Sequence, residues 1–289
     1  MKPAAFDYHA PESLEEALAL LNEYGYEAKL LAGGQSLIPT MNFRLARPAV
    51  LIDLNRIKEL SYIEKNGSGL RLGAMTRQRA LERSELVANH APLLHETMPF
   101  IAHPQIRNRG TIGGNIAHAD PASELPAVMW ALDGYLKLQS AAGERRVAVQ
   151  DFFVGMFTTD LEPEEMLTEI EIPAMFPRSG WAFREIARRH GDYALVGVAA
   201  TVRLDEAGRC EDARLVFFSV GEGPVEAQLA SDALIGELPG DALIETAAAL
   251  AAEADIDPDG DIHASADYRR QLARVLARDT LRRAFERTK

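Results

Sequence analysis

The sequence predicts an α+β chain in two parts, because three features follow one another along it. A segment with two adjacent glycines, Ala32–Ser36, lies between apolar stretches in the order strand, loop, helix, strand. A second glycine pair lies in Thr111–Asn115. Beyond Pro173–Gly180 the pattern changes to three long apolar strands and two helices. We therefore expect a first domain over residues 1–176 and a second over 177–289, the second with a three-stranded antiparallel sheet and helices.

The N-terminal elements are predicted by capping and turn residues. Ser13 begins a capping box that is completed by Glu16, so a helix should run to Tyr24 and end at Gly25. Residues 28–32 and 49–54 are apolar strands, and Ser36 is expected to cap a short helix between them. This β-α-β unit places the first glycine segment at the carboxyl end of a strand, where α/β folds bind ligands.

The remaining elements follow from periodicity and turn signals. A hairpin is expected around 66–69, and helices are expected near 77–82, 92–102 and 123–132. Strands of the first domain are predicted at 60–64, 70–74, 135–139, 146–149 and 169–172. The second domain should contain strands at 181–188, 196–204 and 213–220 and helices at 241–254 and 266–287.

Composition excludes several classes of protein. The chain has 289 residues, of which 47% are hydrophobic and 26% charged, as expected for a globular protein. Its formal net charge of -12 argues against a nucleic-acid partner. No apolar run approaches the ~20 residues of a membrane span, and the start lacks a secretory signal, so we expect a cytoplasmic protein. The single cysteine, Cys210, excludes a disulfide within the chain and cannot alone hold an iron–sulfur cluster.

The two glycine segments are the strongest functional signal. Adjacent glycines can adopt positive φ, so that successive N–H groups point into one concave space that suits a phosphate. Two such segments brought together suit the pyrophosphate of a dinucleotide. Neither follows the G-x-G-x-x-G pattern of a Rossmann fold, and each also has the simpler interpretation of a tight turn.

Polar residues near the second segment have two interpretations each. Asp120 and Glu124 are equally consistent with accepting hydrogen bonds from ribose hydroxyls and with capping a helix. Arg107 and Arg109 could neutralise phosphate, although a solvated surface charge is favoured for Arg107. Tyr193 could stack on a planar ring or be a half-buried structural residue. No nucleophile triad or metal-ligand spacing is found in the sequence.

Longer motifs resemble a known family. These are Ala32–Pro39 with Phe43–Pro48, then Gln105–Glu124, Gly191–Ala194 and Tyr268–Leu276. Together they resemble the FAD-binding medium subunit of molybdenum hydroxylases, the group that includes carbon monoxide dehydrogenase, quinoline oxidoreductase and xanthine dehydrogenases. The resemblance extends over essentially the whole chain, with the motifs in the same order.

The resemblance implies a fold and a binding site. The fold is a two-subdomain FAD-binding domain of the vanillyl-alcohol-oxidase (PCMH) type, followed by a small C-terminal domain of the carbon monoxide dehydrogenase flavoprotein type. The FAD pyrophosphate is expected between the two glycine segments, with Tyr193 near the isoalloxazine and Glu124 toward the adenosine end. The expected cofactor-binding residues are Ala32, Gly33, Gly34, Gln35, Ser36, Leu37, Ile101, Thr111, Gly113, Gly114, Asn115, Ala117, Asp120, Glu124, Leu167, Arg184 and Tyr193.

Arg184 marks a departure from the family pattern. Relatives often carry a lysine beside the flavin near the start of this strand, whereas the present chain reads Phe183-Arg184-Glu185-Ile186. We expect Arg184 to substitute for that lysine, with a planar guanidinium in place of a point charge.

The resemblance also implies partners. A small subunit would carry two 2Fe-2S clusters, and a large subunit would hold the molybdenum–pterin cofactor and the substrate. This chain would pass electrons from a cluster through non-covalently bound FAD to an external acceptor, in a dimer of heterotrimers. No catalytic or metal-binding residue is expected on the chain itself. The alternatives are a self-contained flavin-dependent reductase or dehydrogenase of the same fold and a non-enzymatic interaction domain.

Overall fold

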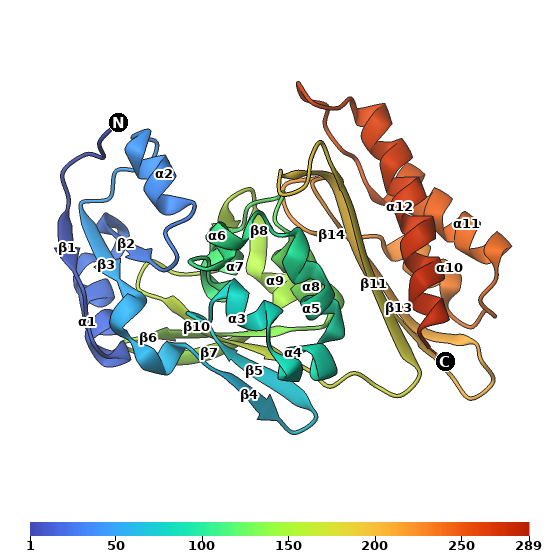
Figure 1. Cartoon of the computed structure of the whole chain (residues 1–289), viewed down its shortest axis with the longest axis horizontal. Coiled ribbons are helices and arrows are strands. Elements are labelled where there is room, and N and C mark those ends of the chain that lie inside the picture. The colour runs from blue at the N-terminus through green and yellow to red at the C-terminus, as the bar shows by residue number, and fades with distance from the viewer. Residues whose placement is uncertain (289) are drawn as a thin grey trace.

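The computed structural model describes residues 1–288 and arranges them in three neighbouring regions (Figure 1). A small N-terminal lobe lies beside a central region of sheet and helices, and the C-terminal sheet and its helices lie on the far side of that region. The buried apolar side chains form three clusters, one within the N-terminal lobe, one centred on the central region and one between the C-terminal sheet and its helices.

The N-terminal lobe is built on a parallel sheet. Its strands β1 (Asp7–His9), β3 (Val50–Asp53) and β2 (Ala28–Leu31) pair in that order. Helix α1 (Leu14–Tyr24) is capped by Ser13 as predicted, and α2 (Leu37–Asn42) connects β2 to β3. The predicted β-α-β unit is therefore confirmed. Strand β1 has only three residues and was not predicted from the sequence.

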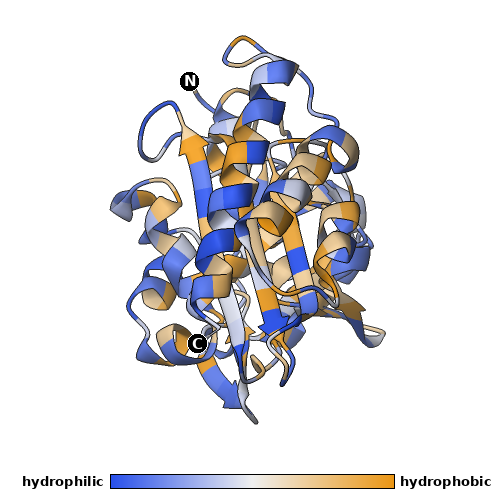
Figure 2. Cartoon of the chain, turned by 90° about the vertical axis from the view of Figure 1, so that its right-hand side faces the viewer, coloured by the Kyte–Doolittle hydropathy of each residue, from blue (hydrophilic) through white to orange (hydrophobic). Residues whose placement is uncertain are grey.

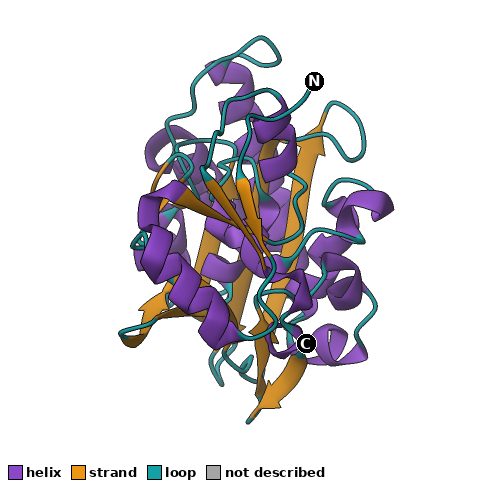
Figure 3. Cartoon of the chain, turned by 90° about the vertical axis from the view of Figure 1, so that its left-hand side faces the viewer, coloured by secondary structure: helices purple, strands orange, loops and turns teal. Residues whose placement is uncertain are grey.

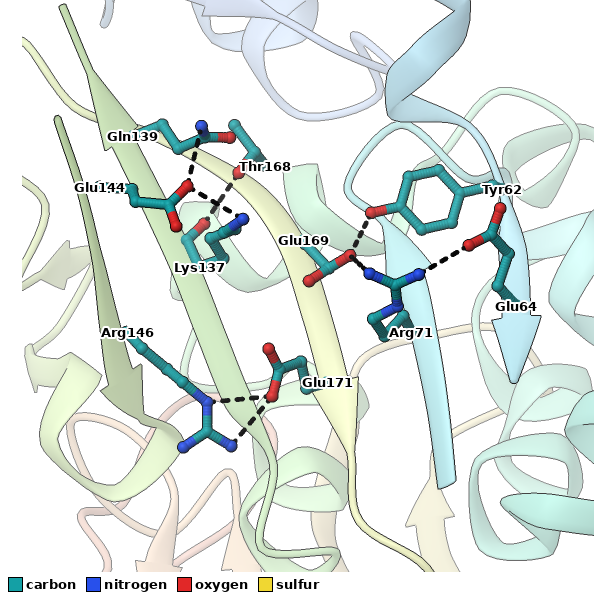
Figure 4. A network of polar contacts seen from close by, with 10 residues as sticks. All are labelled: Tyr62, Glu64, Arg71, Lys137, Gln139, Glu144, Arg146, Thr168, Glu169 and Glu171. Carbon is teal, nitrogen blue, oxygen red and sulfur yellow. Dashed lines mark hydrogen bonds and ion pairs between the residues drawn. The ribbon is translucent and has the colours of Figure 1, made fainter. Parts of the chain in front are cut away.

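The central region is built on an antiparallel sheet of five strands. Their order is β4 (Ile63–Asn66), β5 (Gly69–Gly73), β10 (Met166–Ile172), β6 (Tyr135–Ser140) and β7 (Gly143–Ala148). One face carries buried leucines and isoleucines, such as Leu72, Leu136 and Ile170, which lie opposite one another in the register. The alternate residues are mostly polar or charged, and their contacts cross from strand to strand (Figure 4). This alternation directs the apolar face to the helices.

Short helices cover that apolar face. They are α3 (Gln78–Glu82), α4 (Glu85–His90), α5 (Pro92–Thr97), α6 (Pro104–Arg107), α7 (Ile112–His118), α8 (Glu124–Ala131) and α9 (Val149–Phe152). The two-stranded sheet β8 (Phe153–Gly155) and β9 (Thr158–Thr159) follows α9. Figure 3 shows the regions from the side of the N-terminal lobe. The helix expected over 92–102 ends earlier, because Met98–Phe100 tighten into a 3₁₀ turn.

The C-terminal region contains four strands, one more than predicted. They pair in the order β11 (Ser179–Ala187), β12 (Ala194–Leu204), β13 (Cys210–Phe218) and β14 (Val225–Glu226). Strand β14 has two residues, which is too short to leave a periodic signal in the sequence. Helices α10 (Gln228–Leu234), α11 (Asp241–Leu250) and α12 (Ala266–Glu286) cover one face, and Figure 2 shows the C-terminal helices in front of the sheet.

The other face of the C-terminal sheet packs on the central region. Phe183 and Phe218 stack at 5.8 Å between ring centroids, and Phe100 lies 5.1 Å from Phe183. All three belong to or pack against the core that also contains the buried leucines of the five-stranded sheet. Helices α5 and α8 make this contact. The two domains therefore share one apolar junction. In residues 1–288, no helix is both long and apolar enough to cross a bilayer.

Candidate functional site

The two glycine segments lie in direct contact. A Cβ added to Gly33 would sit 2.5 Å from the carbonyl oxygen of Arg109 and 2.8 Å from the Cα of Gly110. A Cβ added to Gly114 would sit 3.1 Å from the Cβ of Ala32. Side chains at these positions would push the segments apart. The fold thus brings together two stretches that are nearly eighty positions apart in the sequence.

The first segment has unused hydrogen-bond donors. Gly34 has a φ of 73°, in the left-handed region that favours glycine. Its neighbours Gly33, Gln35 and Ser36 surround this turn after strand β2. For residues 1–288, no acceptor is found for the backbone N–H groups of Gly33–Ser36. All four residues are partly exposed, so this run of donors is available to an anion.

The second segment differs from the prediction. Gly113 and Gly114 are not in a left-handed turn but in the first turn of helix α7, and neither has a positive φ. Gly113 donates to the carbonyl of Ala74 at 2.9 Å, and Gly114 donates to Oγ1 of Thr111 at 3.1 Å. A Cβ on Gly113 would come within 2.5 Å of the Cβ of Ala74. Close packing, of Gly113 against Ala74 and of Gly114 against the side chains of Thr111 and Ala32, explains this glycine pair better than turn geometry does.

Two polar residues that sequence reasoning missed hold the segments together. Asn55 donates to the carbonyl oxygen of Ala32 at 2.9 Å. Arg77 donates to Oδ1 of Asn55 at 2.5 Å and also to the carbonyl oxygen of Arg109. Asn55 follows β3 by two positions and Arg77 follows β5 by four. Their positions shortly after strand ends were the only sequence signal that could have marked them as site residues.

Two cationic side chains lie beside the first segment. Arg109 is exposed, and its carbonyl faces Gly33. Burial, followed by the charge of Arg109, lowers the pKa of Arg77. The effect of Arg109 on this pKa means that the two like charges lie within electrostatic reach of each other. An anion bound near them would relieve this repulsion.

Arg107, in contrast, is not a solvated surface charge. It is 4% exposed, and its guanidinium forms two hydrogen bonds to Glu82, at 2.9 and 3.1 Å. It also donates to the carbonyl oxygen of Ile101 at 2.8 Å. The sequence-based preference for a surface role was wrong because the short α6 is folded against α3. Arg107 therefore anchors the backbone that leads into the second segment.

An acidic group follows the second segment. The hydroxyl of Ser123 donates to Oδ1 of Asn115 at 2.6 Å, which ties the start of α8 to the glycine pair. Glu124, the first residue of α8, is 7% exposed, and burial raises its pKa to about 7. Asp120 accepts from the backbone N–H of Ala122 at 2.9 Å in the preceding turn. The structure thus gives Asp120 a local turn role and leaves Glu124 buried.

A loop of the second domain lies against the residues that precede the second glycine segment. A Cβ on Gly191 would overlap the ring of His103 and approach the carbonyl oxygen of Ala102 at 3.0 Å. This contact places the loop against residues that directly follow Ile101. Tyr193, at the end of the loop, is 68% exposed, and partial desolvation followed by the charges of Asp120 and Glu124 raises its pKa.

The other expected cofactor residues have the following positions. Ile101 and Leu167 are buried in the central core. Leu37, at the start of α2, and Ala117, near the end of α7, are half-buried. Ser36 occupies the cap position of α2, but the expected capping hydrogen bond is absent among the described residues because its own backbone is already helical. Arg184 donates to the carbonyl oxygen of Phe183 and lies 3.9 Å from Glu96. No cluster of three metal-ligating side chains is found in residues 1–288.

The arrangement fits the pyrophosphate part of FAD. The first segment supplies four free N–H groups, and Arg77 and Arg109 supply positive charge beside them. The contacts of Gly33 and Gly114 leave no room for side chains between the segments. These are the properties that backbone recognition of a diphosphate requires.

Comparison with protein families gives two matches. Residues 4–175 match the family described as FAD binding domain in molybdopterin dehydrogenase. Residues 181–284 match the CO dehydrogenase flavoprotein C-terminal domain.

Individual relatives cover the full chain. The sequence is 44% identical over 289 residues to the 6-hydroxypseudooxynicotine dehydrogenase complex subunit alpha of Paenarthrobacter nicotinovorans, covering 100% of this chain and 97% of that protein. It is 42% identical to the carbon monoxide dehydrogenase medium chain of Afipia carboxidovorans, covering 100% and 98%. The structure is similar to a chain of carbon monoxide dehydrogenase from Hydrogenophaga pseudoflava, with a TM-score of 0.95, 40% identity and 99% of each chain covered.

Proposed function

The chain belongs to the family of FAD-binding medium subunits of molybdenum hydroxylases, and on that premise we propose how it works in a complex. It takes electrons from the 2Fe-2S clusters of a small subunit and passes them through FAD to an external acceptor. Bound FAD supplies the redox chemistry, and the protein supplies its position and electrostatic environment. The substrate is oxidised on a large subunit with a molybdenum–pterin cofactor.

The observation that carries this proposal is the run of free donors at Gly33–Ser36, in contact with the second glycine segment. In the proposal these N–H groups donate to the diphosphate oxygens. Arg77 and Arg109 neutralise part of its charge. Gly114 lets the two segments approach each other, and Thr111 and Asn115 hold the second segment in place.

The whole set of cofactor contacts remains a prediction. Ala32 and Leu37 flank the first segment, and Ala117 belongs to α7 after the second. Ile101 and Leu167 would form apolar walls, with Tyr193 stacking on the isoalloxazine. We also propose that the domain boundary lies between residues 176 and 177. The family models support it, because one matches up to residue 175 and the other begins at residue 181.

The need for partners is supported by the chain's own residues. Its single cysteine, Cys210, is buried in the core between the C-terminal sheet and its helices, so it offers no cluster site. The relatives are named as subunits or medium chains of larger enzymes. We propose a small iron–sulfur subunit, a large molybdenum subunit, assembly as a dimer of heterotrimers and a cytoplasmic location.

Purification from the native cell tests this proposal. The tagged chain should elute with FAD, iron, molybdenum and two further polypeptides, measured by absorption spectroscopy, metal analysis and gel electrophoresis. Flavin eluting with this chain alone and without metal would contradict the electron-transfer role. It would instead support a self-contained flavoenzyme. A colourless chain that releases no flavin on denaturation would contradict both.

A further inference from the structure

A chain of hydrogen bonds from three parts of the protein meets at Asn55. Asp53 ends β3 in the N-terminal lobe, and its carboxylate caps the 3₁₀ turn Leu54–Arg56 by accepting from the backbone N–H of Asn55 at 2.9 Å. The side-chain amide of Asn55 then donates to Oδ1 of Asp53 and, at 2.9 Å, to the carbonyl oxygen of Ala32. Its Oδ1 accepts from Arg77 of the central region at 2.5 Å. Asn55 is thus joined to its own lobe, to the first glycine segment and to the central region.

The partners of Asn55 fix which way its amide faces. A carbonyl oxygen and an ionised carboxylate only accept hydrogen bonds, so Ala32 and Asp53 require the NH2 group of the amide. A guanidinium only donates, so Arg77 requires the amide oxygen. Turning the amide over would set acceptor against acceptor and donor against donor at all three contacts. The side-chain amide of Asn55 therefore has one orientation.

The neighbours that orient Asn55 are themselves held in place. Oδ2 of Asp53 accepts from the hydroxyl of Tyr8 on β1 at 2.6 Å, while Oδ1 faces Asn55. The backbone of Arg77 pairs with the backbone of Thr111 in the second glycine segment. Asn55 therefore lies between two groups with fixed positions, one in the N-terminal lobe and one in the central region.

The bond to Ala32 determines the direction of the first donor of the glycine segment. The carbonyl of Ala32 and the N–H of Gly33 belong to the same peptide group. A trans peptide is planar, so its C=O and N–H point in opposite directions. Because Asn55 holds the carbonyl oxygen on its own side, it directs the N–H of Gly33 away from itself. No acceptor for that N–H is found in the chain from residue 1 to 288, so the donor remains available to an anion.

The second segment confines the same stretch of backbone. The carbonyl oxygen of Arg109 lies so close to Gly33 that an added Cβ would come within 2.5 Å of it. This oxygen accepts from Arg77, the residue that also orients Asn55. Arg77 therefore fixes both the amide that holds the carbonyl of Ala32 and the oxygen that packs against Gly33.

We propose that Asn55 is a positioning residue for FAD, which orients the N–H of Gly33 toward the diphosphate and is kept in place by Asp53 and Arg77. The inference rests on the proposed function, since it requires the FAD diphosphate at the first glycine segment. Asn55 acts through the peptide group and does not itself contact the cofactor. Because Asn55 belongs to the N-terminal lobe and Arg77 to the central region, the donor is oriented only while these two regions are joined.

Two substitutions separate this role from simple packing. Asn55→Ala removes the contacts to Ala32 and to Arg77 together. Asn55→Asp keeps the size of the side chain and the bond from Arg77, but a carboxylate cannot donate to the carbonyl oxygen of Ala32 and adds a negative charge beside Asp53. A packing role, or a role in holding Arg77, predicts that the aspartate variant binds FAD better than the alanine variant, because a carboxylate–guanidinium bond is strong. Orientation of the peptide group predicts the reverse order.

The test is FAD binding to the purified complex after its flavin has been removed. We expect the dissociation constant to rise about tenfold in N55A, the value of one hydrogen bond, and by more in N55D. The phosphorus NMR resonances of the diphosphate in bound FAD should shift in both variants, while the absorption spectrum of the flavin ring stays like that of the wild type. The control variant N22D makes the same chemical change at an exposed asparagine on α1 and should alter neither measurement.

Three results would overturn the inference and leave the proposed function intact. They are wild-type affinity in both variants, tighter binding by N55D than by N55A, and weaker binding with unshifted phosphorus resonances, which would assign Asn55 to stability alone. If neither variant assembles, R77K takes their place, because lysine keeps the charge but lacks the planar fork that reaches Asn55 and Arg109 together. Its phosphorus resonances should shift, and unshifted ones would overturn the inference. A wild-type complex that binds no FAD would instead contradict the proposed function.

Discussion

The two glycine segments have similar sequences but different physical roles. In the first, Gly34 adopts a left-handed conformation, and the N–H groups of Gly33–Ser36 have no acceptor in the described chain. In the second, the N–H groups of Gly113 and Gly114 are already bonded within the protein. The first segment is therefore suited to bind an anion, and the second is suited to support it.

The difference shows that a glycine pair carries two separate kinds of information. Glycine at Gly34 is explained by backbone conformation. At Gly33, Gly113 and Gly114 it is explained by the atoms that a Cβ would meet. These are backbone atoms at Gly33, atoms of Ala74 at Gly113, and side-chain atoms of Thr111 and Ala32 at Gly114. Sequence alone does not separate these cases, because the colliding atoms come from elsewhere in the chain. The comparison predicts that the segments respond differently to substitution.

The largest effect is expected from Gly114→Val. The new side chain would meet Thr111 Oγ1 at 2.7 Å and Ala32 Cβ at 3.1 Å, and thus force the two segments apart. We expect at least about a 1,000-fold loss of FAD affinity, equivalent to roughly 4 kcal/mol. The measurement is the FAD content of the purified complex and the dissociation constant after flavin removal.

A matched control is Gly240→Val. Gly240 has extended backbone, and an added Cβ there meets nothing within 4 Å. This variant should bind FAD like the wild type. Full flavin content in Gly114→Val would show that contact between the segments is not needed for binding, and the second segment would then have no supporting role.

The sequence predicted local helices and turns better than the long-range contacts that hold the site together. Ser13, Gly25 and the turn at 66–69 gave α1 and the β4–β5 hairpin because these signals are local. Asn55 and Arg77 were missed because their roles depend on partners from different strands. Arg107 was misassigned for the same reason, since its partner Glu82 lies 25 positions away.

The next largest effect concerns the support of the second segment. Arg107→Ala would leave Glu82 without its bidentate partner and remove the bond to Ile101. Loss of one member of a buried pair costs about 3–5 kcal/mol, and we expect the free energy of unfolding to fall by about 3 kcal/mol. Urea unfolding measures this free energy, and Arg83→Ala, at an exposed arginine, is the control variant. An effect on FAD affinity with no change in stability would assign Arg107 to binding.

An effect of similar size, present only at higher pH, is expected from Glu185→Gln. Folding raises the pKa of Glu185 from its ordinary 4.5 to about 8, so the folded state holds more protons than the unfolded state between these values. The free energy of unfolding of the wild type therefore falls as pH rises through this window. The variant cannot ionise there and should gain about 3 kcal/mol relative to the wild type by pH 8, but little at pH 4.5. Thermal unfolding at both pH values measures the difference, and a constant offset would contradict the burial of the Oε2 atom of Glu185.

The smallest effect should come from Arg109→Ala, which tests the first segment as an anion site. The side chain is exposed, so its attraction for the diphosphate is weak and screened by salt. We expect FAD affinity to fall about fivefold at low ionic strength, roughly 1 kcal/mol, and the difference to shrink as salt is added. Arg278→Ala, on the far side of the C-terminal sheet, is the charge-matched control. A loss that persists in high salt would mean that Arg109 makes a desolvated contact with the cofactor. The first segment would then bind through a side chain as well as through its backbone donors.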